Sequence, residues 1–151
     1  MGYNREMNRL SKLLAEYAES HQNSVNINIH KICVPAITFS VVGLLASIPF
    51  NIYGVPPVLY ILAAVALYYA SLSLKYLILF FPVLFVFLAV AFYLQGLGVL
   101  WQLSLGIFVV AWIGQFYGHK VEGKKPSFFK DLQFLLIGPL WTIKTVLKLK
   151  D

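Results

Sequence analysis

Three histidines are the residues of this chain best suited to chemistry. His21, His30 and His119 are the only histidines in the sequence, and imidazole is the commonest neutral ligand of transition metals. Three histidines on one ion leave coordination positions open for a substrate and for oxygen or water. Iron and zinc both suit such a site, and the spacing of the ligands does not choose between them. The simpler interpretation of each histidine alone is an interfacial side chain at a helix end.

Polar side chains accompany the histidines. Asn23 and Asn26 lie between the first two, and Gln115 and Glu122 lie four residues before and three residues after His119. Both offsets face His119 if one helix spans them. Gln115 sits in an apolar segment, so it either serves the site or bonds a neighbouring helix. Glu122 is a candidate fourth ligand, but an acceptor for an imidazole N–H or a surface ion pair is the preferred interpretation.

Lysines and aromatic residues near His119 have simple explanations as well. Lys120 and Lys124 are placed to steer a carboxylate or phosphate head group toward the histidines, but the usual excess of lysine on the cytoplasmic side of membranes is the preferred explanation. Trp112 and Trp141 fit the aromatic belt of a membrane protein and need no catalytic role.

Composition decides which elements must position these residues. The chain is 60% hydrophobic and 12% charged, a balance that one soluble core of this size cannot bury. Lipid must therefore be the solvent for much of the chain. The net charge of +6 is explained by topology and anionic lipids, so nucleic acid is not an expected partner. The lone Cys33 is expected to be a packing residue, and the polar first twenty residues are not a cleavable signal.

Hydropathy predicts a single all-α domain over residues 1–151, a polytopic membrane bundle. Apolar runs of nearly the ~20 residues needed to cross a bilayer predict about four transmembrane helices, over residues 32–50, 58–74, 76–94 and 99–117. An amphipathic helix is expected over residues 4–20, followed by a turn over residues 21–30 that also caps the next helix. Residues 128–150 are expected to form an interfacial or half-inserted helix.

The charge distribution predicts the topology. With four spans, the N-terminal segment, the loop at Lys75 and the C-terminal segment lie on one side of the membrane, and they carry all the charge. The lysine and arginine bias assigns that side to the cytoplasm. The same parity brings the three histidines to one membrane face, although nearly ninety residues separate His119 from the others.

The sequence resembles a known family, the membrane-bound 2-hydroxy fatty acid dioxygenases, typified by the fungal endoplasmic-reticulum enzyme of phytosphingosine breakdown. The resemblance covers nearly the whole chain. One block carries His21-x-Asn23-x-x-Asn26-x-x-x-His30 followed by Val34-Pro35. The other carries Trp112-Ile-Gly-Gln115-Phe-x-Gly118-His119, followed by Lys124-Lys-Pro126 and Gly138-Pro139. The second block is one residue shorter than the fungal pattern before its Lys-Pro segment, so no family role transfers to Glu122.

The resemblance implies an enzyme that uses Fe2+ and O2 to remove one carbon from a 2-hydroxy fatty acid. It places the iron on His21, His30 and His119. A 2-hydroxy acid and oxygen give the acid one carbon shorter, carbon dioxide and water, so the reaction needs no added reductant. The short form of the motif favours a bacterial inner membrane over the endoplasmic reticulum, with the site and both termini cytoplasmic. An acyl tail would lie among the apolar helices, beside membrane lipids.

Other functions account for fewer of these features. A di-iron hydroxylase or desaturase needs more histidines than this chain has, and a haem-binding bundle places its axial histidines inside spans. A small transport or assembly protein remains an alternative, although transport predicts charges at the membrane midplane or inverted repeats. A zinc-dependent lipid hydrolase is the other alternative, because the same three ligands suit zinc.

Overall fold

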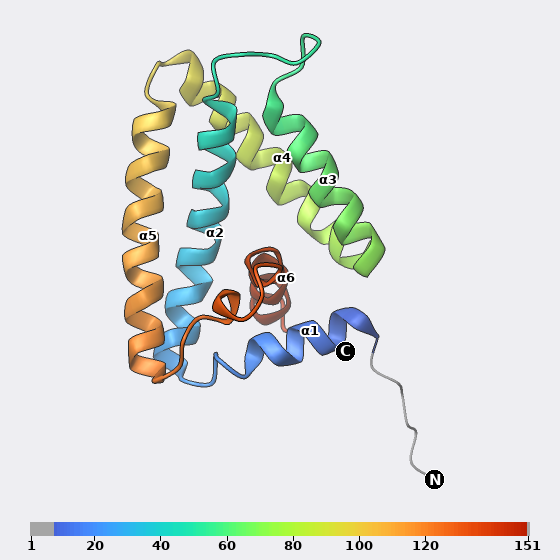
Figure 1. Ribbon diagram of the computed structural model, residues 1–151, viewed down its shortest axis with the longest axis vertical. Coiled ribbons are helices and arrows are strands. Elements are labelled where there is room, and N and C mark those ends of the chain that lie inside the picture. Colours follow the sequence, from blue (N-terminus) through green and yellow to red (C-terminus); the bar gives the residue numbers. More distant parts are fainter. Residues whose placement is uncertain (1–7, 151) are drawn as a thin grey trace.

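In the computed structural model, which describes residues 8–150, helices joined by short loops form an all-α fold (Figure 1), as the sequence predicts. Residues 4–7 of the expected amphipathic helix lie outside the described residues. In chain order the elements are α1 (Arg9–Ala18), α2 (Ser24–Ala46), α3 (Pro57–Leu72), α4 (Leu74–Gly96), α5 (Leu100–Glu122), the short 3-10 helix η1 (Ser127–Phe129) and α6 (Phe134–Val146).

Three of these helices, α2, α4 and α5, are long and apolar enough to cross a membrane, each with 23 residues. The four predicted spans are therefore matched in part. Helix α3 has 16 residues, about 24 Å at ~1.5 Å per residue, which is short of the ~30 Å hydrocarbon layer. Large apolar side chains such as Phe85 and Val110 are exposed along α4 and α5. Surfaces of this kind suit a membrane and not water.

Helix α2 begins at Ser24, whereas hydropathy places the start of the first span at residue 32. The expected turn over residues 21–30 is thus mostly helix. Asn23 does cap it, because its side-chain oxygen accepts a 2.9 Å hydrogen bond from the Val25 N–H. Asn26, which is completely buried, bonds to groups outside the helix. Two of the polar residues that suggested a turn thus have other roles, since Asn23 caps the helix and the Asn26 side-chain nitrogen makes tertiary hydrogen bonds.

Helices α2 and α5 lie side by side along most of their length (Figure 1). Two glycines of α5 face α2. A Cβ atom on Gly114 would lie 2.7 Å from the Cys33 Sγ, and one on Gly118 would collide with the Asn26 side chain. The Gly114–Gly118 spacing therefore permits the close approach that small residues give membrane helices. Cys33 fills space at this contact, as expected.

Helices α1 and α6 lie together across one end of the α2–α5 pair (Figure 1). The apolar face of α1 is buried and includes Leu10, Leu14 and Tyr17, and it joins a cluster with Ile137 and Trp141 of α6. The sequence predicts this amphipathic pattern. The loops joining α2 to α3 and α4 to α5 lie at the opposite end of the molecule. Thus the lysine-rich segment after α5 shares its end of the fold with α1 and α6.

Candidate metal centre

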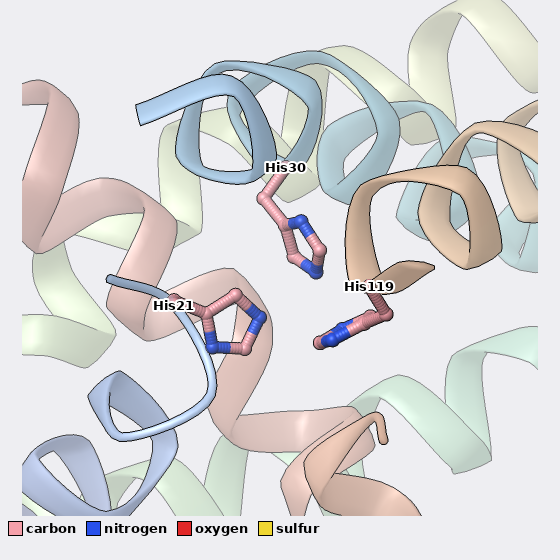
Figure 2. Close-up of side chains that lie close together, drawn as sticks. All are labelled: His21, His30 and His119. Carbon is pink, nitrogen blue, oxygen red and sulfur yellow. The ribbon is translucent and has the colours of Figure 1, made fainter. Parts of the chain in front are cut away.

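The structure brings the three histidines together from three separate segments. His21 follows the end of α1, His30 lies in the first turns of α2, and His119 lies in the last turn of α5. All are buried, with 3%, 1% and 5% of their surface exposed. Their ring centroids are 4.2 Å to 5.0 Å apart, and the rings surround a common point (Figure 2). Each offers a nitrogen within 4.8 Å of the other two.

Backbone carbonyls fix the protonation of two of the rings. The Nδ1 atom of His21 lies 2.6 Å from the Tyr17 carbonyl oxygen, and that of His30 lies 3.0 Å from the Asn26 carbonyl oxygen. Because a carbonyl oxygen only accepts, each Nδ1 must carry the proton. The Nε2 atoms then present lone pairs, and this is the arrangement by which an outer hydrogen bond prepares a histidine for a metal.

Burial also keeps His21 neutral. Loss of hydration lowers the pKa of His21 to about 4, and this effect outweighs the opposing hydrogen bond to the Tyr17 carbonyl. At neutral pH the ring is therefore uncharged and does not need to lose a proton before binding a cation.

The donor set fits a transition-metal ion. The His21 Nε2 and the His119 Nδ1 are buried and have no hydrogen-bond partner among residues 8–150, and such orphaned atoms are costly unless something binds them. Nitrogens bound to one ion at the ~2.0–2.1 Å bond length of zinc lie roughly 3 Å apart, so the three nitrogens here, within 4.8 Å of one another, must move closer when an ion binds. Three neutral imidazoles suit iron as well as zinc.

Glu122 joins the segments that carry the histidines. One carboxylate oxygen accepts a 2.9 Å bond from the Gln22 N–H, and the other accepts bonds from the Asn23 N–H at 2.9 Å and the Asn26 Nδ2 at 3.1 Å. The end of α5 is thereby fastened to the loop after His21 and to the start of α2. Gly123, with φ of 73°, ends α5 directly after this residue.

Asn26 completes this connection beneath the histidines. Its side-chain nitrogen also donates a 3.1 Å bond to the Ser20 carbonyl, while its own backbone carbonyl accepts from His30. Its side-chain oxygen is buried without a partner in the described part of the chain. Asn26 and Asn23 therefore position the segments that carry the histidines. Neither is among the residues proposed to bind the metal.

Gln115 lies where the sequence suggested, one turn before His119, and 6% of its surface is exposed. It lines a cavity of about 50 Å³ together with His30 and His119. The other walls of this histidine cavity come from α1, α2, α5, η1 and α6, and include Tyr17, Val34, Thr38, Trp112, Phe128 and Pro139. Gln115 is thus a polar group in an otherwise mainly apolar chamber next to the histidines.

Lysines gather on the other side of His119. Lys120, Lys124, Lys125 and Lys130 line an open basin that His119 also borders. Lys124 additionally donates a 2.7 Å hydrogen bond to the Glu19 carbonyl, which ties the segment after α5 to the end of α1. His119 therefore stands between this basic basin and the histidine cavity.

Two aromatic residues that pack on His21 were missed by sequence reasoning. The Tyr17 ring stacks on His21 at 4.2 Å, and the Trp141 ring lies 4.9 Å from the same imidazole. Trp141 is buried and does not belong to the lipid-facing belt predicted for it. Tyr17 lies one helical turn before His21, so its spacing was a usable signal. Nothing local in the sequence indicates that α6 would bring Trp141 to the histidines.

A comparison with known protein families adds to this geometry. Residues 7–149 match the family described as 2-hydroxy-palmitic acid dioxygenase Mpo1-like. The chain belongs to the Mpo1-like family. The resemblance found in the sequence is thereby confirmed. No curated protein and no solved structure gave a match. The family description indicates a dioxygenase of lipid metabolism, and the three buried histidines are a group that could hold a metal ion.

Proposed function

We propose that the protein is an iron(II)-dependent dioxygenase that shortens 2-hydroxy fatty acids by one carbon. The observation that carries the proposal is the convergence of three buried imidazoles, two of which are held by backbone carbonyls with Nε2 left free, in a chain of a family described by 2-hydroxy-palmitic acid dioxygenation. Iron bound there would supply the redox chemistry that lets oxygen react with the 2-hydroxy acid.

The residues around the histidines position the rings, attract and orient the substrate, and exclude water. Tyr17 and Asn26 hold the rings of His21 and His30 through their carbonyl oxygens. The lysines of the basic basin attract the carboxylate of the substrate toward His119. Gln115, at the wall of the histidine cavity, is placed to donate a hydrogen bond to the substrate head group. The apolar walls exclude bulk water from the reacting atoms.

Placement in a membrane follows from α2, α4 and α5. We propose that α3 is a fourth span and that α6 lies in the interface. The basic residues at the α1 and α6 end support a cytoplasmic position for the site, and a bacterial inner membrane is the favoured location. In this position a membrane-borne fatty acid reaches the histidines with its polar end.

Metal analysis of the detergent-purified protein is the first test. The variants His21→Ala, His30→Ala and His119→Ala should each retain only a small fraction of the wild-type iron. Asn28→Ala is the control, because Asn28 is an exposed residue of α2, and it should keep the wild-type content. Full metal content in all three histidine variants would refute the site.

Turnover needs a separate test. Anaerobic protein loaded with ferrous iron is given 2-hydroxypalmitic acid and then air, and oxygen uptake and the shortened acid are measured together. Both should appear in equal amounts. If neither appears although the histidines bind metal, the dioxygenase proposal fails. A preference for zinc in the same protein would then favour the lipid hydrolase.

A further inference from the structure

The histidine cavity is too small for a whole fatty acid. Its volume of about 50 Å³ admits a few groups the size of water, whereas sites for whole ligands usually measure ~300–1,000 Å³. If the head group of the substrate lies at the histidines, as the proposed function requires, its alkyl tail must lie elsewhere.

An apolar groove adjoins this cavity. The α2–α4–α6 groove has a volume of about 320 Å³ and shares three wall residues with the histidine cavity, namely Val34, Thr38 and Pro139. Helix α4 contributes apolar side chains along its inner face, and helix α6 contributes more of them beyond Pro139; they include Leu79, Phe80, Val83, Phe87, Ile143 and Val146. The exposed lining of the groove is therefore mainly alkyl and aromatic, although Lys31, Thr38 and Thr142 also border it.

The order of polarity across the site identifies the occupant. The basic basin, the histidines and the apolar groove follow one another, with His119 bordering the basin and the cavity, and Val34 bordering the cavity and the groove. A 2-hydroxy fatty acid has the same order of carboxylate, hydroxyl-bearing carbon and tail. We propose that the α2–α4–α6 groove holds the alkyl tail of the substrate and sets the chain length that the enzyme accepts. This inference rests on the proposed function for the position of the head group.

Phe87 lines the groove where α4 meets α2. Helices α2 and α4 contact one another, and Phe87 of α4 packs edge-to-face on Phe39 of α2 with ring centroids 5.5 Å apart. Leu79 lies about two turns earlier on α4. Val83, between them, is half-buried and lines the groove. A larger side chain at position 83 therefore obstructs the tail without touching the histidines.

A matched pair of variants tests this obstruction. Val83→Trp fills the groove, whereas Val86→Trp places the same side chain on an exposed face of the same helix. Retention of radiolabelled 2-hydroxypalmitic acid is measured without oxygen, so that no turnover is required. Val83→Trp should weaken binding by about tenfold or more, and Val86→Trp should match the wild type. Equal binding by the two variants would overturn the proposal, provided that both keep the wild-type metal content.

Photolabelling of the wild-type protein gives an answer that does not depend on variants. A 2-hydroxy fatty acid with a diazirine at the end of its tail should label residues of α4 and α6 that line the groove. Labelling confined to lipid-facing positions would overturn the proposal. So would loss of a co-purified phospholipid from Val83→Trp with no change in acid binding, because the groove would then hold a membrane lipid. If the groove is labelled but the protein never consumes oxygen, the proposed tail site is supported and the proposed function is refuted.

Discussion

Glu122 ties the loop that carries His21 to the helix that carries His119. Its two oxygens accept from two backbone N–H groups and from Asn26, an arrangement that suits an ionised carboxylate, which only accepts. Hydrogen bonds to a charged acceptor are about twice as strong as neutral ones. The relative position of two of the three histidines therefore depends on one acidic side chain that is not itself a proposed ligand.

Glu122→Gln should weaken metal binding without removing a ligand. The glutamine amide keeps one acceptor oxygen, but its NH2 group must face an N–H donor of the loop. We expect the metal affinity to fall by roughly 10–100-fold, the usual effect of losing a group that orients ligands. Glu16→Gln, on the exposed face of α1, is the control and should bind as the wild type does. Competition with a fluorescent chelator measures both, and equal affinities would rule out a positioning role.

For single residues, the sequence indicates which side chains belong to the site but not which groups they bond. The parity of the four predicted spans was enough to predict that the three histidines come together, and the Tyr17–His21 and Asn26–His30 bonds both follow helical i, i+4 spacing. The partners of Glu122 are mostly backbone groups, which carry no sequence signal. That is why its role could not be predicted.

Among the elements, the α2–α5 contact controls the distance between His30 and His119. Gly118→Ala should disturb it, because the added Cβ would collide with Asn26, which sits one turn before His30. Crowding of a packed interior commonly costs ~1–3 kcal/mol. We expect a lower midpoint of thermal unfolding in detergent and a lower metal content.

Gly106 provides the matched control on the same helix. A Cβ atom at this position meets nothing within 4 Å. Gly106→Ala should therefore leave both the unfolding midpoint and the metal content at or above the wild-type values. If Gly118→Ala behaves like Gly106→Ala, the close approach of α2 and α5 does not matter for the site.

Helix type was predictable from hydropathy, but helix ends were not. The apolar runs indicate where α2, α4 and α5 lie, because lipid selects for them. The start of α2 lies in a polar stretch that hydropathy assigns to a turn, and it is helical because Asn23 caps it and Asn26 finds tertiary partners. Contacts of that kind appear only when the helices are assembled.

For the whole molecule, a metal on the three histidines would link the end of α1, α2 and α5. An ion that binds only the folded state stabilises it by ~2.7 kcal/mol at 100 times its dissociation constant. For a chain of this size that corresponds to roughly 5–10 °C in the unfolding midpoint. Adding a chelator to metal-loaded protein should lower the midpoint by this amount, and it should change nothing in His119→Ala. An equal shift in His119→Ala would place the stabilising ion elsewhere.

The topology depends on α3, whose 16 residues give about 24 Å of helix. If α3 spans the membrane, the loop before it and the turn after it lie on opposite sides.

In a Cys33→Ala background, the variants Tyr53→Cys, Leu74→Cys and Glu16→Cys place single thiols at exposed positions, and all three keep the lysines that orient the chain. A membrane-impermeant maleimide added from the cytoplasmic side of vesicles should label Glu16→Cys and Leu74→Cys and leave Tyr53→Cys unreacted until detergent is added. Labelling of Tyr53→Cys and Leu74→Cys from one side would mean that α3 does not cross. With only α2, α4 and α5 as spans, the start of α2 and the end of α5 would lie on opposite sides of the membrane, and this would also contradict the clustering of His30 with His119.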